Sequence, residues 1–360
     1  MNPTLAGAPH LPPISTVGGV MRQVLYALVP GIVAHVVYFG VGILFQILLA
    51  VGFALLLEAA MLKLRDRPLK PFLSDYSAVV TAVLFALCMP PLAPWWIALT
   101  GMVFAIVIAK HLYGGLGSNL FNPTMVGFAA VIIAFPIELS QWLAPRSLTP
   151  GLPGIGETAA AIFTGQLPPS VSWDAISQAT PLDALKTGVA ENRLVTEIRD
   201  APIFGDFGGL GWEWIANFYA LGGMYLVWRR VISWHVPVAV IGTTILVSTP
   251  LWLLGPDIHP SPLQHVFSGA LVLAAFFIAT DPVSGCSTMR GRLVFGAGVA
   301  ILTLAIRRYG GYPDGVAFAV LLMNMAVPLI DRVTRPRTYG HGRFPFSVFR
   351  LPTSDFRPPT

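Results

Sequence analysis

Long apolar runs recur along the whole chain and constrain its fold more than any other feature of the sequence. A transmembrane helix needs about 20 mainly apolar residues to cross the hydrocarbon core of a bilayer. Hydrophobic residues make up 55% of the chain and charged residues only 11%, whereas soluble domains carry roughly 25% charged residues. The sequence therefore predicts an all-α, polytopic membrane protein. About ten transmembrane helices are expected, at 23–40, 42–62, 76–93, 95–111, 124–140, 212–229, 232–254, 264–280, 292–306 and 315–332.

Basic side chains lie at the ends of these runs in a pattern that predicts the topology. Lys and Arg are enriched in cytoplasmic loops, and ten spans place nearly all of the basic clusters on one side, with Arg307 and Arg308 as the exception. The region 139–211 then faces outward, and its acidic residues outnumber its basic ones. We expect both termini in the cytoplasm. The clusters are Lys63, Arg65, Arg67 and Lys70; Arg229 and Arg230; Arg290 and Arg292; and Arg332, Arg335, Arg337, Arg343 and Arg350.

Two related segments indicate an internal repeat. HLYGGLGSN begins at His111 and RRYGGYPDG begins at Arg307; each follows a helix-breaking segment, FALCMPP from Phe85 and FFIATDP from Phe276. Five predicted spans separate the two units, and an odd number inverts the second unit relative to the first. Inverted repeats with broken helices commonly place a binding site near the middle of the membrane. The simpler alternative is that Tyr-Gly-Gly is only a turn between spans.

The chain accordingly divides into five expected parts. They are a cytoplasmic N-terminal tail (1–22), a first five-helix membrane repeat (23–140), a periplasmic loop domain (141–211), a second five-helix membrane repeat (212–332) and a cytoplasmic C-terminal tail (333–360).

Motifs of soluble catalytic, metal or nucleotide sites are absent from the sequence. The chain has no Cys-X-X-Cys, no His-Glu-X-X-His and no Walker loop. We therefore expect no catalytic residue, no metal site and no nucleic-acid partner. Cys88 and Cys286 are expected to be buried, inert thiols, because two cysteines cannot hold an iron–sulfur cluster without ligands from another polypeptide.

Four polar residues within or beside the apolar runs are candidates for function, as intramembrane polar groups generally are. His35 is either a proton relay or ligand contact or, more simply, one hydrogen bond between helices. Glu58 lies near the cytoplasmic end of its run and is expected to extend its carboxylate toward water. Asp281 and Asp314, at the repeat breaks, are candidates for a cation path, although loop aspartates also act as turn or cap residues.

The segment SQATPLDALK, from Ser177 to Lys186, differs from its apolar surroundings and has the pattern of a helix start. Thr180 is the expected N-cap and Pro181 the first helical residue, with Asp183 in the first turn and Gly188 at the end. Pro181 disfavours the helical region for the residue before it and so keeps Thr180 extended. A cap is the plainest interpretation of this threonine.

Four segments resemble one family of membrane proteins: SDYSAVVTAVLFALCMPP, KHLYGGLGSNLFNPTMVGFAAV, ATPLDALK and FIATDPVSGCSTMRGRLVFG. Over residues 20–340 the chain is similar to the D subunit of the Rnf electron-transport complex, which is related to the B subunit of the sodium-translocating NADH:quinone reductase. The B subunit has a longer N-terminal extension. The resemblance implies a subunit of an ion-pumping complex that links reduced ferredoxin and NAD at the bacterial inner membrane.

The resemblance also implies a covalent flavin. In that family a threonine before proline carries FMN as a phosphoester, and the matching residue is Thr180. The attachment signal corresponds to Asp174, Ser177 and Ala179, with Gln178 in place of the usual glycine. A separate flavin transferase is implied, because an alkyl hydroxyl is a poor nucleophile. The flavin would lie on the periplasmic loop domain, and a second flavin such as riboflavin is expected between the helices.

Other subunits follow from the same resemblance. No segment of this chain suits NAD or ferredoxin, so those sites are expected on partners, which include the flavin-bearing G subunit and the iron–sulfur subunits. Two alternatives stay open on the residues alone. One is a secondary transporter, because inverted repeats with broken helices are typical of that class. The other is a scaffold subunit without a redox group.

Overall fold

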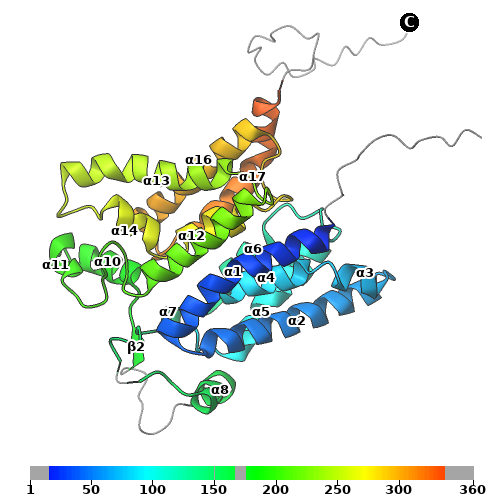
Figure 1. The fold of residues 1–360 in the computed structure, drawn as a ribbon, viewed down its shortest axis with the longest axis horizontal. Coiled ribbons are helices and arrows are strands. Elements are labelled where there is room, and N and C mark those ends of the chain that lie inside the picture. The colour runs from blue at the N-terminus through cyan, green and yellow to red at the C-terminus, as the bar shows by residue number, and fades with distance from the viewer. Residues whose placement is uncertain (1–15, 150, 167–175, 337–360) are drawn as a thin grey trace, which may run out of the picture.

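The computed structural model describes residues 16–149, 151–166 and 176–336, and helices dominate this part of the chain (Figure 1). Among these residues, six helical segments are long and apolar enough to cross a membrane, as expected for a polytopic helical membrane protein. They are α1 (Val17–Phe39), α2 (Gly42–Leu64), the segment Leu69–Ala86 with α3 (Leu69–Leu73) and α4 (Ser77–Ala86), α13 (His235–Leu254), α16 (Met289–Tyr309) and α17 (Val316–Thr334).

The other predicted runs hold shorter or interrupted helices. Length and composition alone do not qualify them as spans, so the number ten stays a prediction. They are α5 (Trp95–Met102) continuing into the π-helix η1 (Val103–His111), α6 (Pro123–Ala134), α12 (Trp212–Trp228), and α14 (Pro262–Phe267) followed by α15 (Leu271–Leu273) and the π-helix η2 (Ala274–Ile278).

Both expected helix breaks lie where the sequence predicts them. α4 ends at Ala86, and the chain is irregular over 87–94 before α5 begins. η2 ends at Ile278, and the chain is irregular over 279–288 before α16 begins. Proline stops a helix because it lacks an N–H group, and prolines occur in both breaks. Irregular backbone at membrane depth is tolerated only where protein or a water-filled cavity surrounds it.

The helices form two groups that lie side by side (Figure 1). One group runs from α1 to α6 and the other from α12 to α17; they meet where α1 packs against α12 and α6 against α17. Glycines bring α1 and α12 close together. A Cβ atom on Gly222 would overlap the carbonyl oxygen of Ala27, and one on Gly31 would overlap the ring of Tyr219. Small residues commonly permit such close approach of membrane helices.

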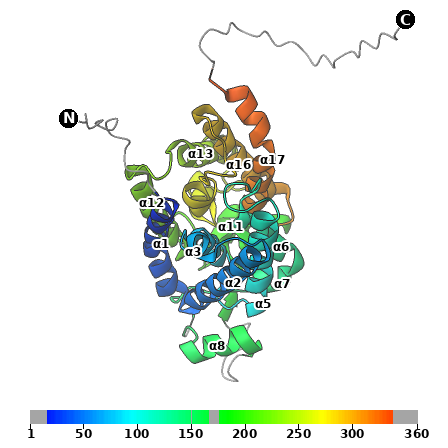
Figure 2. The ribbon, with the colours of Figure 1, turned by 90° about the vertical axis from the view of Figure 1, so that its right-hand side faces the viewer.

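The segment between the two groups consists of short elements at one end of the bundle (Figure 1). β1 (Trp142–Leu143) and β2 (Ser177–Gln178) form a two-stranded antiparallel pair. In Figure 2, α8 (Ile155–Thr164) lies below α2 at the edge of the structure. The elements are α7 (Pro136–Ser140), β1 (Trp142–Leu143), α8 (Ile155–Thr164), β2 (Ser177–Gln178), α10 (Pro181–Ala190) and α11 (Val195–Arg199).

Candidate functional site

Thr180 lies at the start of α10 in the conformation that the sequence predicts. Its backbone is extended, with φ −67° and ψ 157°, and Pro181 is the first helical residue. The N–H group of Asp183 donates a hydrogen bond to Oγ1 of Thr180 at 3.2 Å. The N-cap interpretation is thus confirmed. Thr180 is half-buried, and it lines a cavity described below.

The end of α10 differs from the prediction. The helix does not stop at Gly188 but continues to Ala190, with Glu191 as its C-cap. Gly188 is instead a close-packing position, because a Cβ atom there would lie 2.5 Å from Cδ1 of Ile198. The glycine therefore permits α11 to pack closely on α10, rather than ending the helix.

The residues before Thr180 form an extended lead-in. Ser177 pairs with Leu143 and Gln178 with Trp142 across the two short strands, and Ala179 is exposed. Three of the four predicted attachment residues, Ser177, Ala179 and Thr180, therefore lie together on one extended stretch. The fourth, Asp174, is outside the described residues.

A cavity of about 330 Å³ lies beside Thr180, between the two groups of helices. Ligand pockets in proteins commonly have roughly 300–1,000 Å³. The walls are mainly apolar and aromatic. Elements from both helix groups and from the segment between them contribute to these walls. The lining residues include His35, Cys88, Phe128, Trp142, Trp212, Tyr219 and Tyr312.

Two buried polar atoms at this cavity have no hydrogen-bond partner among the described residues. They are Nε2 of His35 and the hydroxyl oxygen of Tyr219. Nε2 of His35 therefore does not make the expected hydrogen bond between helices, which stays a prediction for the other ring nitrogen. Instead, the imidazole packs against aromatic rings, with centroids 5.3 Å from Phe39 and 6.0 Å from Trp212.

A cluster of polar contacts holds α10 on the loop before α17. Nζ of Lys186 donates to the carbonyl oxygen of Tyr312 at 2.6 Å and also to that of Gly310. The loop is held from its other side by Arg307, whose guanidinium donates to Oδ1 of Asp314 at 3.2 Å and to the carbonyl oxygen of Ser268 at 3.0 Å. The second Tyr-Gly-Gly motif thus anchors the helix that begins at Thr180.

Burial shifts the acid–base behaviour of α10. Burial raises the pKa of Asp183 above its usual range, and the charge of Lys186 opposes that shift. Burial likewise lowers the pKa of Lys186, with the charge of Asp183 opposing it. Asp183 and Lys186 therefore interact electrostatically within α10.

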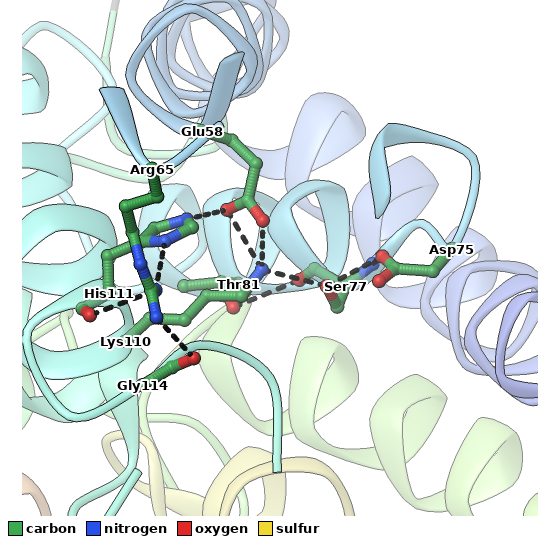
Figure 3. A network of polar contacts seen from close by, with 8 residues as sticks. All are labelled: Glu58, Arg65, Asp75, Ser77, Thr81, Lys110, His111 and Gly114. Carbon is green, nitrogen blue, oxygen red and sulfur yellow. Dashed lines mark hydrogen bonds and ion pairs between the residues drawn. The ribbon is translucent and has the colours of Figure 1, made fainter. Parts of the chain in front are cut away.

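A second polar cluster lies at the first Tyr-Gly-Gly motif (Figure 3). Glu58 is buried and does not extend toward water, so that expectation is wrong. Its carboxylate accepts from Nζ of Lys110 at 2.8 and 2.9 Å and lies 3.2 Å from Nε2 of His111. Arg65 donates to the carbonyl oxygens of His111 at 3.3 Å and Gly114 at 3.1 Å. The sequence singles out Glu58 but does not indicate that Lys110 and His111, just before Tyr-Gly-Gly, are its partners.

The two candidate aspartates line different cavities. Asp314 lines the cavity beside Thr180, and its carboxylate accepts from Arg307 and, at 2.8 Å, from the N–H group of Ala270. Asp281 lines a smaller cavity of about 140 Å³, which Lys110 also lines. The side chain of Asp281 accepts from Oγ of Ser284 at 2.6 Å. Asp281 acts at least as a turn residue, and Arg307 neutralises Asp314.

The cysteines are buried and unbridged. Cys88 and Cys286 are both free thiols, as expected. Within the described ranges, no group of three or more His, Cys, Asp or Glu side chains is arranged to hold a metal ion.

Comparisons with known proteins agree on one family. The model of the NQR2, RnfD, RnfE family matches residues 4–340. A protein of Aeromonas hydrophila subsp. hydrophila, named as the D subunit of an ion-translocating oxidoreductase complex, is 49% identical over 332 residues, which cover 90% of this chain and 94% of that protein. Proteins with the same name from Vibrio cholerae serotype O1 and Escherichia coli O127:H6 are 46% and 47% identical, and each alignment covers 94% of this chain and at least 98% of the relative.

Proposed function

The chain belongs to the NQR2, RnfD, RnfE family, and on this premise we propose that it is the membrane-embedded D subunit of an ion-translocating oxidoreductase complex with FMN attached to Thr180. The name that the relatives share supports the assignment to such a complex. The geometry of Thr180 supports the attachment site. The flavin, when bound, would take up electrons from one partner and pass them to another. Na⁺ or H⁺ transport would be driven by that transfer.

One observation carries the assignment to Thr180. The hydroxyl group lies on an extended residue, after an extended lead-in, at the rim of the cavity between the two helix groups. The N-terminal turn of α10 presents backbone N–H groups, and helix N-termini favour anions such as a phosphate ester. Asp183 in the first turn opposes an anion at this position, and the charge of Lys186 on the same helix acts against that of Asp183. The residues present therefore fit a phosphate-linked flavin at this position.

The remaining parts of the proposal concern place and partners. The loop segment that contains α10 lies on the periplasmic side of the inner membrane, with both termini in the cytoplasm, in accordance with the basic clusters. Modification requires a flavin transferase. Ferredoxin and NAD bind to other subunits, and the G subunit and the iron–sulfur subunits exchange electrons with this chain. A second flavin such as riboflavin would lie between the helices.

The test is flavin fluorescence of the denatured polypeptide on a gel. Wild-type protein made together with its transferase should fluoresce and carry the additional mass of FMN. Thr180→Val keeps the branched shape but removes the hydroxyl group, so fluorescence and added mass should disappear while the protein still inserts. Thr180→Ser should retain some flavin. The matched control is Thr187→Val, since Thr187 is an exposed threonine on the same helix. Full fluorescence in Thr180→Val refutes attachment at this residue.

A secondary transporter is the second candidate, because two cavities lie between the helix groups, one beside Thr180 and one beside Asp281. Paired cavities at inverted, broken helices suit alternating access. A transporter without a redox group would show no flavin fluorescence in the wild-type protein. It would also transport its substrate when reconstituted alone.

A further inference from the structure

The hydroxyl group of Thr180 is already engaged in the folded protein. Thr180 is half-buried, and its Oγ1 accepts a hydrogen bond from the N–H group of Asp183 at 3.2 Å as the cap of α10. An alkyl hydroxyl needs a general base within hydrogen-bond reach before it attacks a phosphate group, and the reacting atoms must approach to about 3.5 Å. A second enzyme that modifies Thr180 therefore has to surround this oxygen atom with its own base and nucleotide.

The first turn of α10 leaves no room for such an enzyme. Pro181 and Leu182 are buried. A Cβ atom on Gly209, in the loop before α12, would overlap Cγ of Pro181. A Cβ atom on Gly269, between α14 and α15, would lie 2.5 Å from Cδ1 of Leu182. Two segments thus enclose the residues directly after Thr180 so closely that one added methyl group would displace them.

The residues before Thr180 are held as well. β2 pairs with β1 directly upstream of this threonine. The carbonyl oxygen of Ile176 accepts a hydrogen bond from the N–H group of Ala144 at 2.9 Å, and the side chain of Ile176 is buried. Neither flank of Thr180 is therefore free to enter another active site while β2 and α10 keep these positions.

The hydrophobic contacts of α10 beyond its first turn are local. Leu185 packs with Val195 and Ile198 of α11 in a small cluster that is separate from the main core between the membrane helices. A polar contact joins this part of α10 to the second helix group, since Nζ of Lys186 donates to two carbonyl oxygens of the second Tyr-Gly-Gly loop. Units with few contacts to the core open locally at a lower free energy than the whole fold. α10 can therefore leave the helix groups without unfolding them.

We propose that the flavin transferase acts on an open conformation, in which the start of α10 has left its place between the helix groups. The contact of Lys186 with the second Tyr-Gly-Gly loop sets how often this conformation forms. This inference rests on the proposed function. In the open conformation, Oγ1 of Thr180 attacks the phosphorus atom of the FMN half of FAD. An Oγ1–P bond forms, the P–O bond of the pyrophosphate bridge breaks, AMP leaves with the bridging oxygen, and the hydroxyl proton passes to the base of the transferase.

The first experiment measures attachment to the folded protein. Full-length protein is made without the transferase, purified in detergent and incubated with the transferase and FAD, and covalent fluorescence on a denaturing gel is followed over time. Lys186→Met should raise the initial rate by roughly thirtyfold, because the open population grows by the factor that corresponds to a lost hydrogen bond to a charged group, about 2 kcal/mol. Arg199→Met, at an exposed basic residue on α11, should be modified at the wild-type rate.

A second variant promotes opening without changing α10 itself. Gly209→Ala displaces Pro181 through the added methyl group and should also raise the rate. Gly156→Ala, at a glycine of the loop segment where a Cβ atom would meet nothing within 4 Å, should not. Wild-type rates in both Lys186→Met and Gly209→Ala overturn the inference but leave the attachment site standing. So does a failure to modify either variant when protein made together with the transferase carries flavin. Absence of covalent flavin from that co-produced protein overturns the proposed function as well.

Discussion

Nζ of Lys186 lies 2.6 Å from the carbonyl oxygen of Tyr312, 126 positions further along the chain. This contact joins the helix that begins at the proposed flavin-bearing threonine to the second Tyr-Gly-Gly loop. That loop is itself held by Arg307 through Asp314. α10 is therefore fixed to the second helix group, and not only to its neighbours in the loop segment.

Lys186→Met should loosen α10 without unfolding the bundle. The variant loses charge-assisted hydrogen bonds to two backbone carbonyl groups, and hydrogen bonds to charged groups contribute roughly 1.5–3 kcal/mol. Amide hydrogen exchange over 181–190 should accelerate by roughly thirtyfold, which corresponds to about 2 kcal/mol of local opening free energy. Arg199→Met, at an exposed basic residue on α11, serves as the control. Unchanged exchange in Lys186→Met would show that Lys186 does not anchor this helix.

Glu58→Gln should destabilise the first helix group. Removing one member of a buried ion pair leaves the other charge uncompensated, and the cost is about 3–5 kcal/mol. The ammonium of Lys110 is 3% exposed at the side chain and has only Ser77 as a further hydrogen-bond partner among the described residues. We expect a clear drop in the thermal unfolding temperature of the protein in detergent. Glu197→Gln, at an exposed glutamate, should show none.

A double variant tests whether the loss of stability in Glu58→Gln comes from the broken ion pair with Lys110 or from local disruption of the packing. In Glu58→Gln combined with Lys110→Met, no buried ammonium is left without its partner. The unfolding temperature should therefore recover part of the loss. If the two losses simply add, the ion pair between Glu58 and Lys110 does not couple them.

Local features of this chain were predictable from sequence, whereas contacts between distant segments were not. The start of α10 follows from Thr180 and Pro181, because caps act within one helical turn. Both helix breaks follow from proline-containing segments. The pairing of Glu58 with Lys110 spans 52 positions and depends on how α2 meets η1. An isolated glutamate near the end of an apolar run is equally consistent with an exposed carboxylate.

The error at Gly188 and the unpartnered Nε2 of His35 have the same origin, because both depend on how separate elements pack. Glycine has two uses, ending a helix and permitting close packing, and only the position of Ile198 decides between them. A buried histidine is usually paired, and only the arrangement of α1 and α12 shows that Nε2 lies at a cavity instead. The likeness to a family pointed to Thr180, but it did not indicate Tyr219 as a cavity residue.

Gly222→Ala should disturb the contact between the two helix groups. The added methyl group would overlap the carbonyl oxygen of Ala27, so α1 and α12 must move apart. Overpacking of this kind costs roughly 1–3 kcal/mol. Thermal unfolding in detergent should shift to lower temperature. Gly52→Ala is the control, since a Cβ atom there meets nothing within 4 Å; an equal effect of both substitutions would point to helix propensity rather than packing.

A reporter that is active only in the periplasm tests the topology. Fused near Gly188 it should be active, and fused after Arg335 it should be inactive, because the basic clusters predict an outward loop segment and a cytoplasmic C-terminus. A reporter that is active only in the cytoplasm should give the reverse pattern. Five predicted spans separate the two fusion positions, and an odd number of crossings places them on opposite sides of the membrane. Periplasmic activity at both positions therefore contradicts ten spans.

Asp281→Asn tests the cation path. Asp281 lines the cavity next to Lys110, and an ionised carboxylate there would supply the negative charge that a cation needs. The substitution should lower ion transport by the reconstituted complex and leave covalent flavin fluorescence unchanged.

Ser284→Ala is the matched control. It removes the hydroxyl group that donates to Asp281 at 2.6 Å and leaves the charge in place. If Asp281 only shapes the turn, both variants should reduce stability slightly and transport should be unaffected in both. A loss of transport confined to Asp281→Asn assigns the charge itself to the path.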